Sequence, residues 1–294
     1  MTTVRISALR HSAFYSPLLV AIGGGFLQRA GLTPDYAPAP MHKPVQAGLE
    51  DGSYHVAQSA VATHFAALER GEQPVTAHFA QINARDGFFI AARVPDADFH
   101  WQKLAGKTVL VDHFFQPLAM LKYGLHRAGV AYTDIRAVDV GDVAAIDAAF
   151  RRGEGDYVHQ QGPAPQQMSR DGIAHVVAAV GDAVGPVAFS SLCARRDWLR
   201  TDMAHAFTHA YAQARAFTVS ADAPEIAAII APFFPAIDRM VLTETVATYQ
   251  RLGCWEPAIE ISRASYEALL DVFAFNGLIS RRHPYEAAVA APPV

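Results

Sequence analysis

The sequence contains one short pattern twice: Gly52-Ser53-Tyr54-His55-Val56-Ala57 and Gly153-Glu154-Gly155-Asp156-Tyr157-Val158. Each copy follows an amphipathic run and precedes small or polar residues, Gln58-Ser59-Ala60 in the first and His159-Gln160-Gln161 in the second. Each therefore predicts a helix end, a glycine stop, a short buried strand and a loop. Because open α/β sheets bind ligands at the carboxyl ends of their strands, we expect two similar halves that share one cleft. The alternative is that the glycines and polar residues only form turns.

The composition is that of a globular protein with a sizeable core. The 294 residues are 51% hydrophobic and 18% charged, which fits one large domain or two of ordinary size. A net charge of -4 without a basic stripe argues against nucleic-acid binding. Cys193 and Cys254 are too far apart to indicate a disulfide framework or a zinc site, so we interpret both as buried free thiols. His205 and His209 lack a neighbouring motif glutamate, and neither a metal nor a cofactor is predicted.

The sequence carries no sign of membrane insertion. No stretch approaches the roughly 20 apolar residues of a membrane span. No apolar signal-peptide segment precedes the first strand-like residues, 1–6. As written, the chain is expected to be cytoplasmic, and it would be periplasmic if a leader had been removed.

Predicted strands alternate with predicted helices along most of the chain. We expect strands at 4–9, 34–39, 54–58, 75–83, 88–93, 108–111, 135–140, 156–159, 175–180 and 187–192. Helices are expected at 17–29, 43–50, 61–70, 117–127 and 143–151, and the chain from 198 onward is helical in pattern. Asp86-Gly87 predicts a hairpin turn between two of these strands. The alternation predicts an α/β fold with mostly parallel sheets flanked by helices.

Several motifs, in this order and spacing, resemble the type II periplasmic solute-binding proteins. They are Pro17-Leu18-Leu19-Val20-Ala21, Gly25-Phe26-Leu27, Ala30-Gly31-Leu32, Leu104-Ala105-Gly106-Lys107-Thr108-Val109, Arg251-Leu252-Gly253-Cys254-Trp255 and Asn276-Gly277-Leu278-Ile279, together with the repeated pattern. The resemblance covers nearly the whole chain and is strongest to the branch with sulfonate binders, nitrate binders and yeast-type thiamine-pyrimidine synthases. The sequence departs from the family at His55, where an acidic residue is usual.

The resemblance implies two lobes joined by two crossing segments, with a helical C-terminal tail and a ligand between the lobes. The first lobe would comprise residues 1–92 and 190–294, and the second residues 93–189. It also implies a solute-binding protein that closes by hinge motion, as the substrate-binding component of an ABC-type importer or a cytosolic relative of one. A small molecule would be its ligand and an ABC permease a further partner.

The loops after the first strand of each predicted half supply the sharpest candidates for binding. His11, Phe14 and Tyr15 could stack on and hydrogen-bond a planar ligand, or the two larger rings could merely fix the next helix to the core. In the second half, Pro117 opens a helix whose free N–H groups suit a carboxylate, sulfonate or phosphate. The preceding residues His113, Phe114, Phe115 and Gln116 would line that site, although one phenylalanine could be core and the other could pack between lobes.

Polar residues at other strand ends complete the candidate site. Ser59 and Ala60 follow one strand, Asn83 ends another, and His159 and Gln160 end a third. Ser59 could bind a ligand or merely cap the next helix, and Asn83 leaves a similar choice. The polar run His159-Gln160-Gln161 needs partners that a ligand or the opposite lobe could supply. Together the candidates predict a small, planar, anionic organic ligand.

An enzyme on the same fold is the main alternative, acting in the cytosol on a small heteroaromatic or sulfur-containing compound. The resemblance to thiamine-pyrimidine synthases would require a lysine and a histidine, but Ser59 and Thr63 stand at those positions and His64 is one residue away. The cysteine-rich iron motif of those enzymes is also missing. A ligand-sensing or partner-binding protein is a third possibility, without a visible effector domain.

Overall fold

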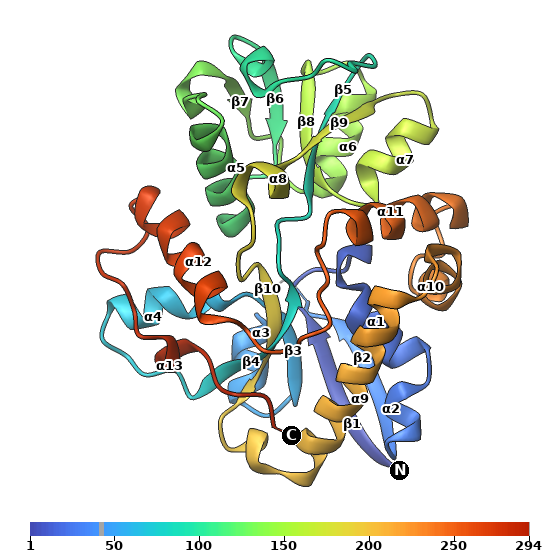
Figure 1. Ribbon diagram of the computed structural model, residues 1–294, viewed down its shortest axis with the longest axis vertical. Helices are drawn as coiled ribbons and strands as arrows, with labels where there is room; N and C mark the ends of the chain where they lie inside the picture. The colour runs from blue at the N-terminus through green and yellow to red at the C-terminus, as the bar shows by residue number, and fades with distance from the viewer. Residues whose placement is uncertain (41–43, 294) are drawn as a thin grey trace.

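The computed structural model describes residues 1–40 and 44–293, which form two five-stranded sheets flanked by helices (Figure 1). The strand order is β2-β1-β3-β10-β4 in the first sheet and β7-β6-β8-β5-β9 in the second. The strands are β1 (Thr2–Ala8), β2 (Leu32–Pro38), β3 (Val56–Ser59), β4 (Thr76–Asn83), β5 (Phe88–Ala92), β6 (Thr108–Val111), β7 (Arg136–Val138), β8 (Tyr157–Gln161), β9 (His175–Ala179) and β10 (Ser190–Arg195). The two orders match position by position, and the repeated pattern leads into the middle strand of each sheet, β3 or β8.

The repeated pattern also makes the same contact in both halves. Asp156, just before β8, accepts a hydrogen bond from the backbone N–H of Thr108 in β6 at 2.8 Å. In the first half, Nδ1 of His55 accepts one from the N–H of Arg5 in β1 at 3.0 Å. His55 therefore replaces the usual acid without loss of the bond, because an unprotonated imidazole nitrogen can accept a hydrogen bond as a carboxylate does.

Each sheet is mostly parallel, as predicted. The first three strands of each half pair in parallel, whereas β10 in the first sheet and β5 in the second are antiparallel to their neighbours. These two strands follow the crossings from the other sheet, so they start at the edge where the parallel strands end. The carboxyl ends of the parallel strands and the starts of β5 and β10 therefore face one cleft.

The chain crosses between the sheets at residues 84–87 and 185–189. The predicted hairpin at Asp86-Gly87 is wrong, because β4 pairs with β10 while β5 pairs with β8 and β9. Phe88–Ala92, expected in the first lobe, consequently belongs to the second sheet. Gly87 is needed because the backbone passes close to a side chain, and not because of a turn. A Cβ at this position would lie 2.3 Å from the ring of Phe14.

Helices cover both sheets (Figure 1). They are α1 (Ser16–Gly23), α2 (Phe26–Arg29), α3 (Val45–Glu50), α4 (Phe65–Glu69), α5 (Phe115–Arg127), α6 (Val143–Arg151), α7 (Ala164–Arg170), α8 (Val180–Val184), α9 (Asp202–Ser220), α10 (Ala223–Ile230), α11 (Arg239–Arg251), α12 (Arg263–Phe275) and α13 (Tyr285–Ala288). Short 3-10 turns occupy residues 13–15, 61–64, 101–104, 132–134, 198–200 and 231–233. The predicted start of one helix, Lys43, lies outside the described residues. Two C-terminal helices bridge toward the second half, where α11 contacts α7 and α12 contacts α5.

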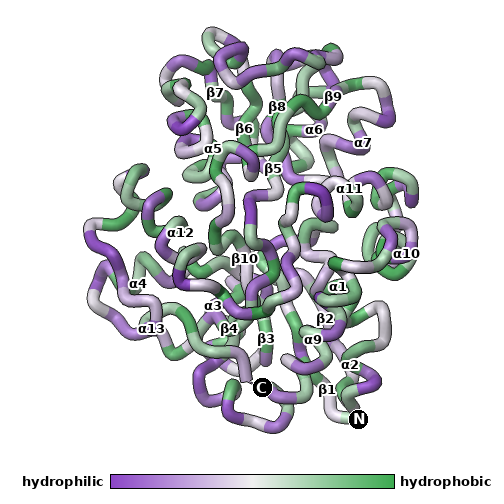
Figure 2. Tube along the Cα trace, viewed as in Figure 1, coloured by the Kyte–Doolittle hydropathy of each residue, from purple (hydrophilic) through white to green (hydrophobic). Residues whose placement is uncertain are grey.

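Hydrophobic stretches run through the strands of both sheets (Figure 2), and one continuous buried cluster extends from Val4 to Val289. The single helix predicted at 17–29 is broken into α1 and α2, because Gly25 adopts a φ of 76° that interrupts the helix. Among the described residues, no helix is long and apolar enough to cross a membrane.

Candidate ligand-binding site

A narrow cavity of about 330 Å³, its open mouth included, lies between the two halves. Its lining combines aromatic rings, three amide side chains and one guanidinium: Leu9, Arg10, Tyr15, Gln58, Ala60, Phe88, Phe114, Gln116, Pro117, Gln161, Phe189 and Ser190. Most of these residues lie at or just beyond the strand ends that face the cleft. Only about 30 Å³ of that space is open to a water-sized molecule, so a larger ligand requires the two halves to move apart.

The strongest contact across the cleft joins Arg10, which follows β1, to Asp112, which follows β6. The guanidinium donates to both carboxylate oxygens, at 2.7 and 3.1 Å. It also lies over the Phe114 ring, 4.4 Å from the centroid. Burial alone would raise the pKa of Asp112, but the hydrogen bonds and charge of Arg10 hold it below the ordinary value. The pair is therefore ionised at neutral pH and links the two halves.

Amide groups supply most of the remaining polarity of the cavity. Nε2 of Gln116 donates to the Phe189 carbonyl at 2.6 Å, while its Oε1 has no hydrogen-bond partner among the described residues. Nε2 of Gln161 makes no well-formed hydrogen bond within residues 1–40 and 44–293, although the amide lies near the Tyr15 phenol. Burial raises the pKa of Tyr15 although Arg10 opposes this, so its phenol stays neutral. A buried polar atom without a partner is costly, which makes these two amides suited to a ligand.

A wider, open pocket adjoins the narrow cavity and shares Leu9, Arg10 and Phe114 with it. This outer pocket has three carboxylates, from Asp112, Asp139 and Asp142. Its basic side chains are Arg10 and His113. The imidazole of His113 bonds the Val111 carbonyl at 2.8 Å and lies 3.9 Å from the carboxylate of Asp139. The mouth of the cleft is therefore acidic, while the cation is held at its inner end.

Five of the twelve predicted binding residues border these two spaces. Tyr15, Ala60 and Gln116 line the narrow cavity, Phe114 lines both spaces, and His113 lines the outer pocket. Their participation in binding stays a prediction.

Four first-half candidates lie elsewhere. His11 faces away from the cavity, where its ring bonds the hydroxyl of Tyr36 and the carbonyl of Phe233 and stacks on Phe234 at 4.7 Å. Phe14 is fully buried in the core, and Asn83 donates to its carbonyl at 2.7 Å. Ser59 contacts Thr63 within its own loop. Each of the four therefore has its partners within the chain: core packing for Phe14, a backbone carbonyl for Asn83, and side-chain contacts for Ser59 and His11.

The second-half candidates beyond the cavity also have structural surroundings. Phe115 lines neither space, and its ring packs against Phe273 of α12 with the centroids 5.2 Å apart. His159 is fully buried and stacks under Phe88 at 4.9 Å, and burial lowers its pKa to about 4. Gln160 donates to the Val143 carbonyl at 3.0 Å. The ring of His159 supports the cavity from behind Phe88 and does not border the cavity itself.

The sequence reasoning missed Arg10, Asp112, Gln58, Phe88 and Phe189. One signal was available, because Arg10 follows the first strand of one half and Asp112 follows the first strand of the other. These equivalent loops of opposite charge face each other across the cleft. Phe88 and Phe189 were not predicted as site residues. Phe88 begins β5 and Phe189 immediately precedes β10, and each of these strands follows a crossing from the other sheet.

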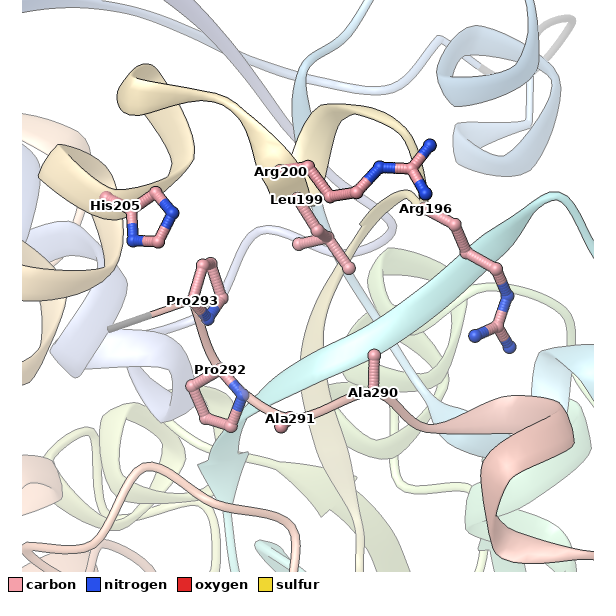
Figure 3. Close-up of a pocket in the computed structure, with 8 residues that line it drawn as sticks. All are labelled: Arg196, Leu199, Arg200, His205, Ala290, Ala291, Pro292 and Pro293. Atoms are coloured by element: carbon pink, nitrogen blue, oxygen red, sulfur yellow. The ribbon is translucent and has the colours of Figure 1, made fainter.

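Other features lie away from the cleft. At the end of the first half opposite the cleft, a surface pocket is formed where the C-terminal stretch passes the start of α9 (Figure 3). Its lining is Arg196, Leu199, Arg200, His205, Ala290, Ala291, Pro292 and Pro293. The first half also contains one group of side chains that could bind a metal: His64, His78 and Cys193. Their ligating atoms lie within 4.8 Å of one another, and no other such group occurs among the described residues.

Comparisons with known proteins agree with this architecture. The alkanesulfonate-binding protein SsuA from Xanthomonas axonopodis pv. citri, bound to MOPS, superimposes with a TM-score of 0.75 at 18% identity, over 99% of each chain. The periplasmic nitrate-binding protein NrtA from Synechocystis PCC 6803 gives a TM-score of 0.70 at 14% identity, over 98% of this chain and 84% of that one. The predicted periplasmic-binding-protein fold is thereby confirmed.

Sequence comparison identifies the family. YtlA of Bacillus subtilis (strain 168), provisionally named a binding protein, is 27% identical over 98% of this chain and 88% of its own. The model of the NMT1/THI5-like family matches residues 13–225, well over half of the chain. The chain belongs to the NMT1/THI5-like family, on the fold of the periplasmic solute-binding proteins.

Proposed function

We propose that this chain is a solute-binding protein that closes on a small organic molecule with a planar apolar part and one anionic group. The observation that carries the proposal is the make-up of the cavity between the halves: four aromatic rings, three amides and one arginine. Such a lining stacks on a flat ligand and orients it through a few hydrogen bonds. The names of relatives that bind alkanesulfonate and nitrate support an anionic ligand.

Arg10 is the residue proposed to bind the anionic group. Two of the five N–H donors of its guanidinium reach Asp112, which leaves donors for a second acceptor. The start of α5 favours negative charge on the same side of the cleft. Asp112 already uses that position, since it accepts the N–H of Phe114 at 2.9 Å. The ligand anion and Asp112 would therefore share or compete for one cationic site.

The two sheets with their helices are proposed to act as lobes that move about the crossings at 84–87 and 185–189. Arg10 and Asp112 stand on opposite lobes, so their ion pair would favour the closed arrangement. Structural neighbours named as periplasmic, and one from Staphylococcus aureus named as the ligand-binding component of an ABC-type import system, suggest a role in import with an ABC permease as partner. No covalent step is required of any residue in the cavity.

Native mass spectrometry of freshly purified protein would test the proposal first, because closed clefts retain ligand. Isothermal titration should then compare benzoate and benzenesulfonate with benzamide and benzylamine. We expect the anions to bind best and Arg10→Met to weaken them at least tenfold. Arg136→Met, an exposed arginine on β7, is the matched control and should leave binding unchanged.

Two results would contradict the proposal. Preferred binding of benzylamine would reject the anionic ligand. Chemical conversion of a retained ligand by the purified protein would replace the binding function with catalysis.

A further inference from the structure

Three buried side chains in the first half form a compact group that the cleft does not use. His64 lies in the 3-10 turn after β3, His78 in β4 and Cys193 in β10, and their exposed fractions are 2%, 0% and 1%. Cys193 and His78 are direct partners in the antiparallel pairing of β10 with β4, so both side chains point to the same face of the sheet. The ring of His64 covers them, with its centroid 4.5 Å from that of His78.

The ligating atoms have nearly the spacing that a bound metal imposes. Nε2 of His64 lies 4.0 Å from Sγ of Cys193, and all three atoms fall within 4.8 Å. The same nitrogen contacts Oγ1 of Thr76 at 2.9 Å, a hydrogen bond that a bound metal would replace. Metal–nitrogen and metal–sulfur bonds of about 2.0 and 2.3 Å place such atoms about 3.7 Å apart in a trigonal arrangement. Even the widest pair would need to close by only about 1 Å, within reach of small side-chain rotations.

The protonation of the group also fits metal binding. Nδ1 of His78 contacts Oγ of Ser191 at 2.8 Å, while its Nε2 has no hydrogen-bond partner among the described residues. That arrangement leaves the Nε2 lone pair for a metal. Burial lowers the pKa of both histidines, that of His64 to about 4, so both imidazoles are neutral. Burial raises the pKa of Cys193 to about 12, so without a metal this side chain is a thiol.

The charge around the group decides between metals. Arg196 lies close enough to depress the pKa of His64 and His78, and its guanidinium donates to the backbone carbonyls of Pro74, Glu286 and Ala287. Figure 3 shows this arginine beside the C-terminal stretch. A divalent ion on one thiolate would leave a net positive charge buried near it, which is unfavourable. A monovalent ion replaces the thiol proton without changing the net charge.

We propose that His64, His78 and Cys193 bind one Cu(I) ion with trigonal geometry. Cu(I) displaces the thiol proton, forms one Cu–S bond and two Cu–N bonds, and releases that proton to solvent. Thiolate and imidazole are ligands that suit this soft ion. His64 also lines a surface pocket with Gln46 and Arg195, which gives the ion a route to the buried group.

Anaerobic titration with Cu(I), in competition with the chromophoric chelator bicinchoninate, tests the proposal on the whole chain. We expect one tightly bound ion per chain, and X-ray absorption should give one sulfur and two nitrogen neighbours. Cys193→Ala should lose at least 100-fold in affinity. Cys254→Ala removes the other buried thiol and should bind like the wild type. Circular dichroism of the metal-free variants establishes that both are folded.

The X-ray absorption measurement on wild-type protein needs no variant, so it decides the question even if Cys193→Ala does not fold. A wild-type affinity no higher than that of Cys193→Ala overturns the site. A neighbour shell without sulfur also overturns it. Zn²⁺ binding as tightly as Cu(I) to the same three residues overturns the assignment of a monovalent ion.

Discussion

Asp112→Asn isolates the charge of the carboxylate that stands closest to the proposed anion site. The asparagine has nearly the same shape, and its Oδ1 can still accept hydrogen bonds from Arg10 and from the N–H of Phe114. The substitution therefore removes a negative charge while the cleft keeps its form. If the ligand is an anion bound to Arg10, its affinity should rise.

The size of the effect follows from the geometry. A ligand anion and the Asp112 carboxylate on either side of one guanidinium would lie about 6 Å apart, which gives a repulsion of about 1.4–2.8 kcal/mol at an effective dielectric constant of about 20–40. The Arg10 side chain is 20% exposed, so solvent screens part of this repulsion. We take the lower value, about 1.4 kcal/mol, which corresponds to an affinity increase of about tenfold.

Isothermal titration with the best anion of the benzoate and benzenesulfonate pair measures the change. Asp139→Asn is the matched control, because this carboxylate also borders the outer pocket but its side chain is 57% exposed. Its effect should stay within about 0.5 kcal/mol. Unchanged affinity in Asp112→Asn would refute the competition between ligand and carboxylate. Weaker binding would show that Asp112 itself contacts a cationic ligand.

Three further predictions concern neighbouring residues. Phe114→Ala should weaken the bound anion by about 1–3 kcal/mol in the same titration, whereas Phe115→Ala, which faces another helix, should change it by less than about 0.5 kcal/mol; equal losses would contradict the site. Gly87→Ala should lower the urea-unfolding free energy by about 1–3 kcal/mol, because its Cβ would overlap a core ring, while Gly124→Ala in α5 has room and should not destabilise. Burial raises the pKa of Asp86 to about 8, so between pH 4 and 8 the folded state holds a proton that the unfolded state has lost, and stability should fall as pH rises through that range. Asp86→Asn should abolish this slope in urea unfolding at pH 5 and 8, and an unchanged slope would exclude Asp86 as its source.

Local patterns were sufficient to predict the repeated architecture. The glycine stops before β3 and β8 and the polar residues after them are short-range signals, and both strands take the central position in their sheets. The departure at His55 did not weaken the prediction, because the bond it makes depends on an acceptor at that position and not on an acid. Mostly parallel sheets followed from the alternation of strands with helices.

The crossings were harder to predict because they depend on contacts distant in sequence. Asp86-Gly87 has the composition of a hairpin turn. The glycine is needed because the ring of Phe14 packs against the backbone there, a contact that the local sequence does not show. The strand Phe88–Ala92 pairs with β8, some seventy residues later, so its neighbours in sequence carry no information about its sheet. The same limit hid Phe88 and Phe189 from the predicted site.

The polar residues divide according to what each strand end faces. A polar side chain after a buried strand needs a partner, but the sequence does not say whether that partner is a ligand, the backbone or the opposite half. His11 and Asn83 bond the chain itself, whereas Gln116 and Gln161 keep an unpartnered atom within the described cavity. Arg10 is the instructive case, since its charge is paired across the cleft. A binding residue of this kind becomes recognisable only when the two halves are aligned on each other, because the loop after β1 and the loop after β6 then carry opposite charges that meet.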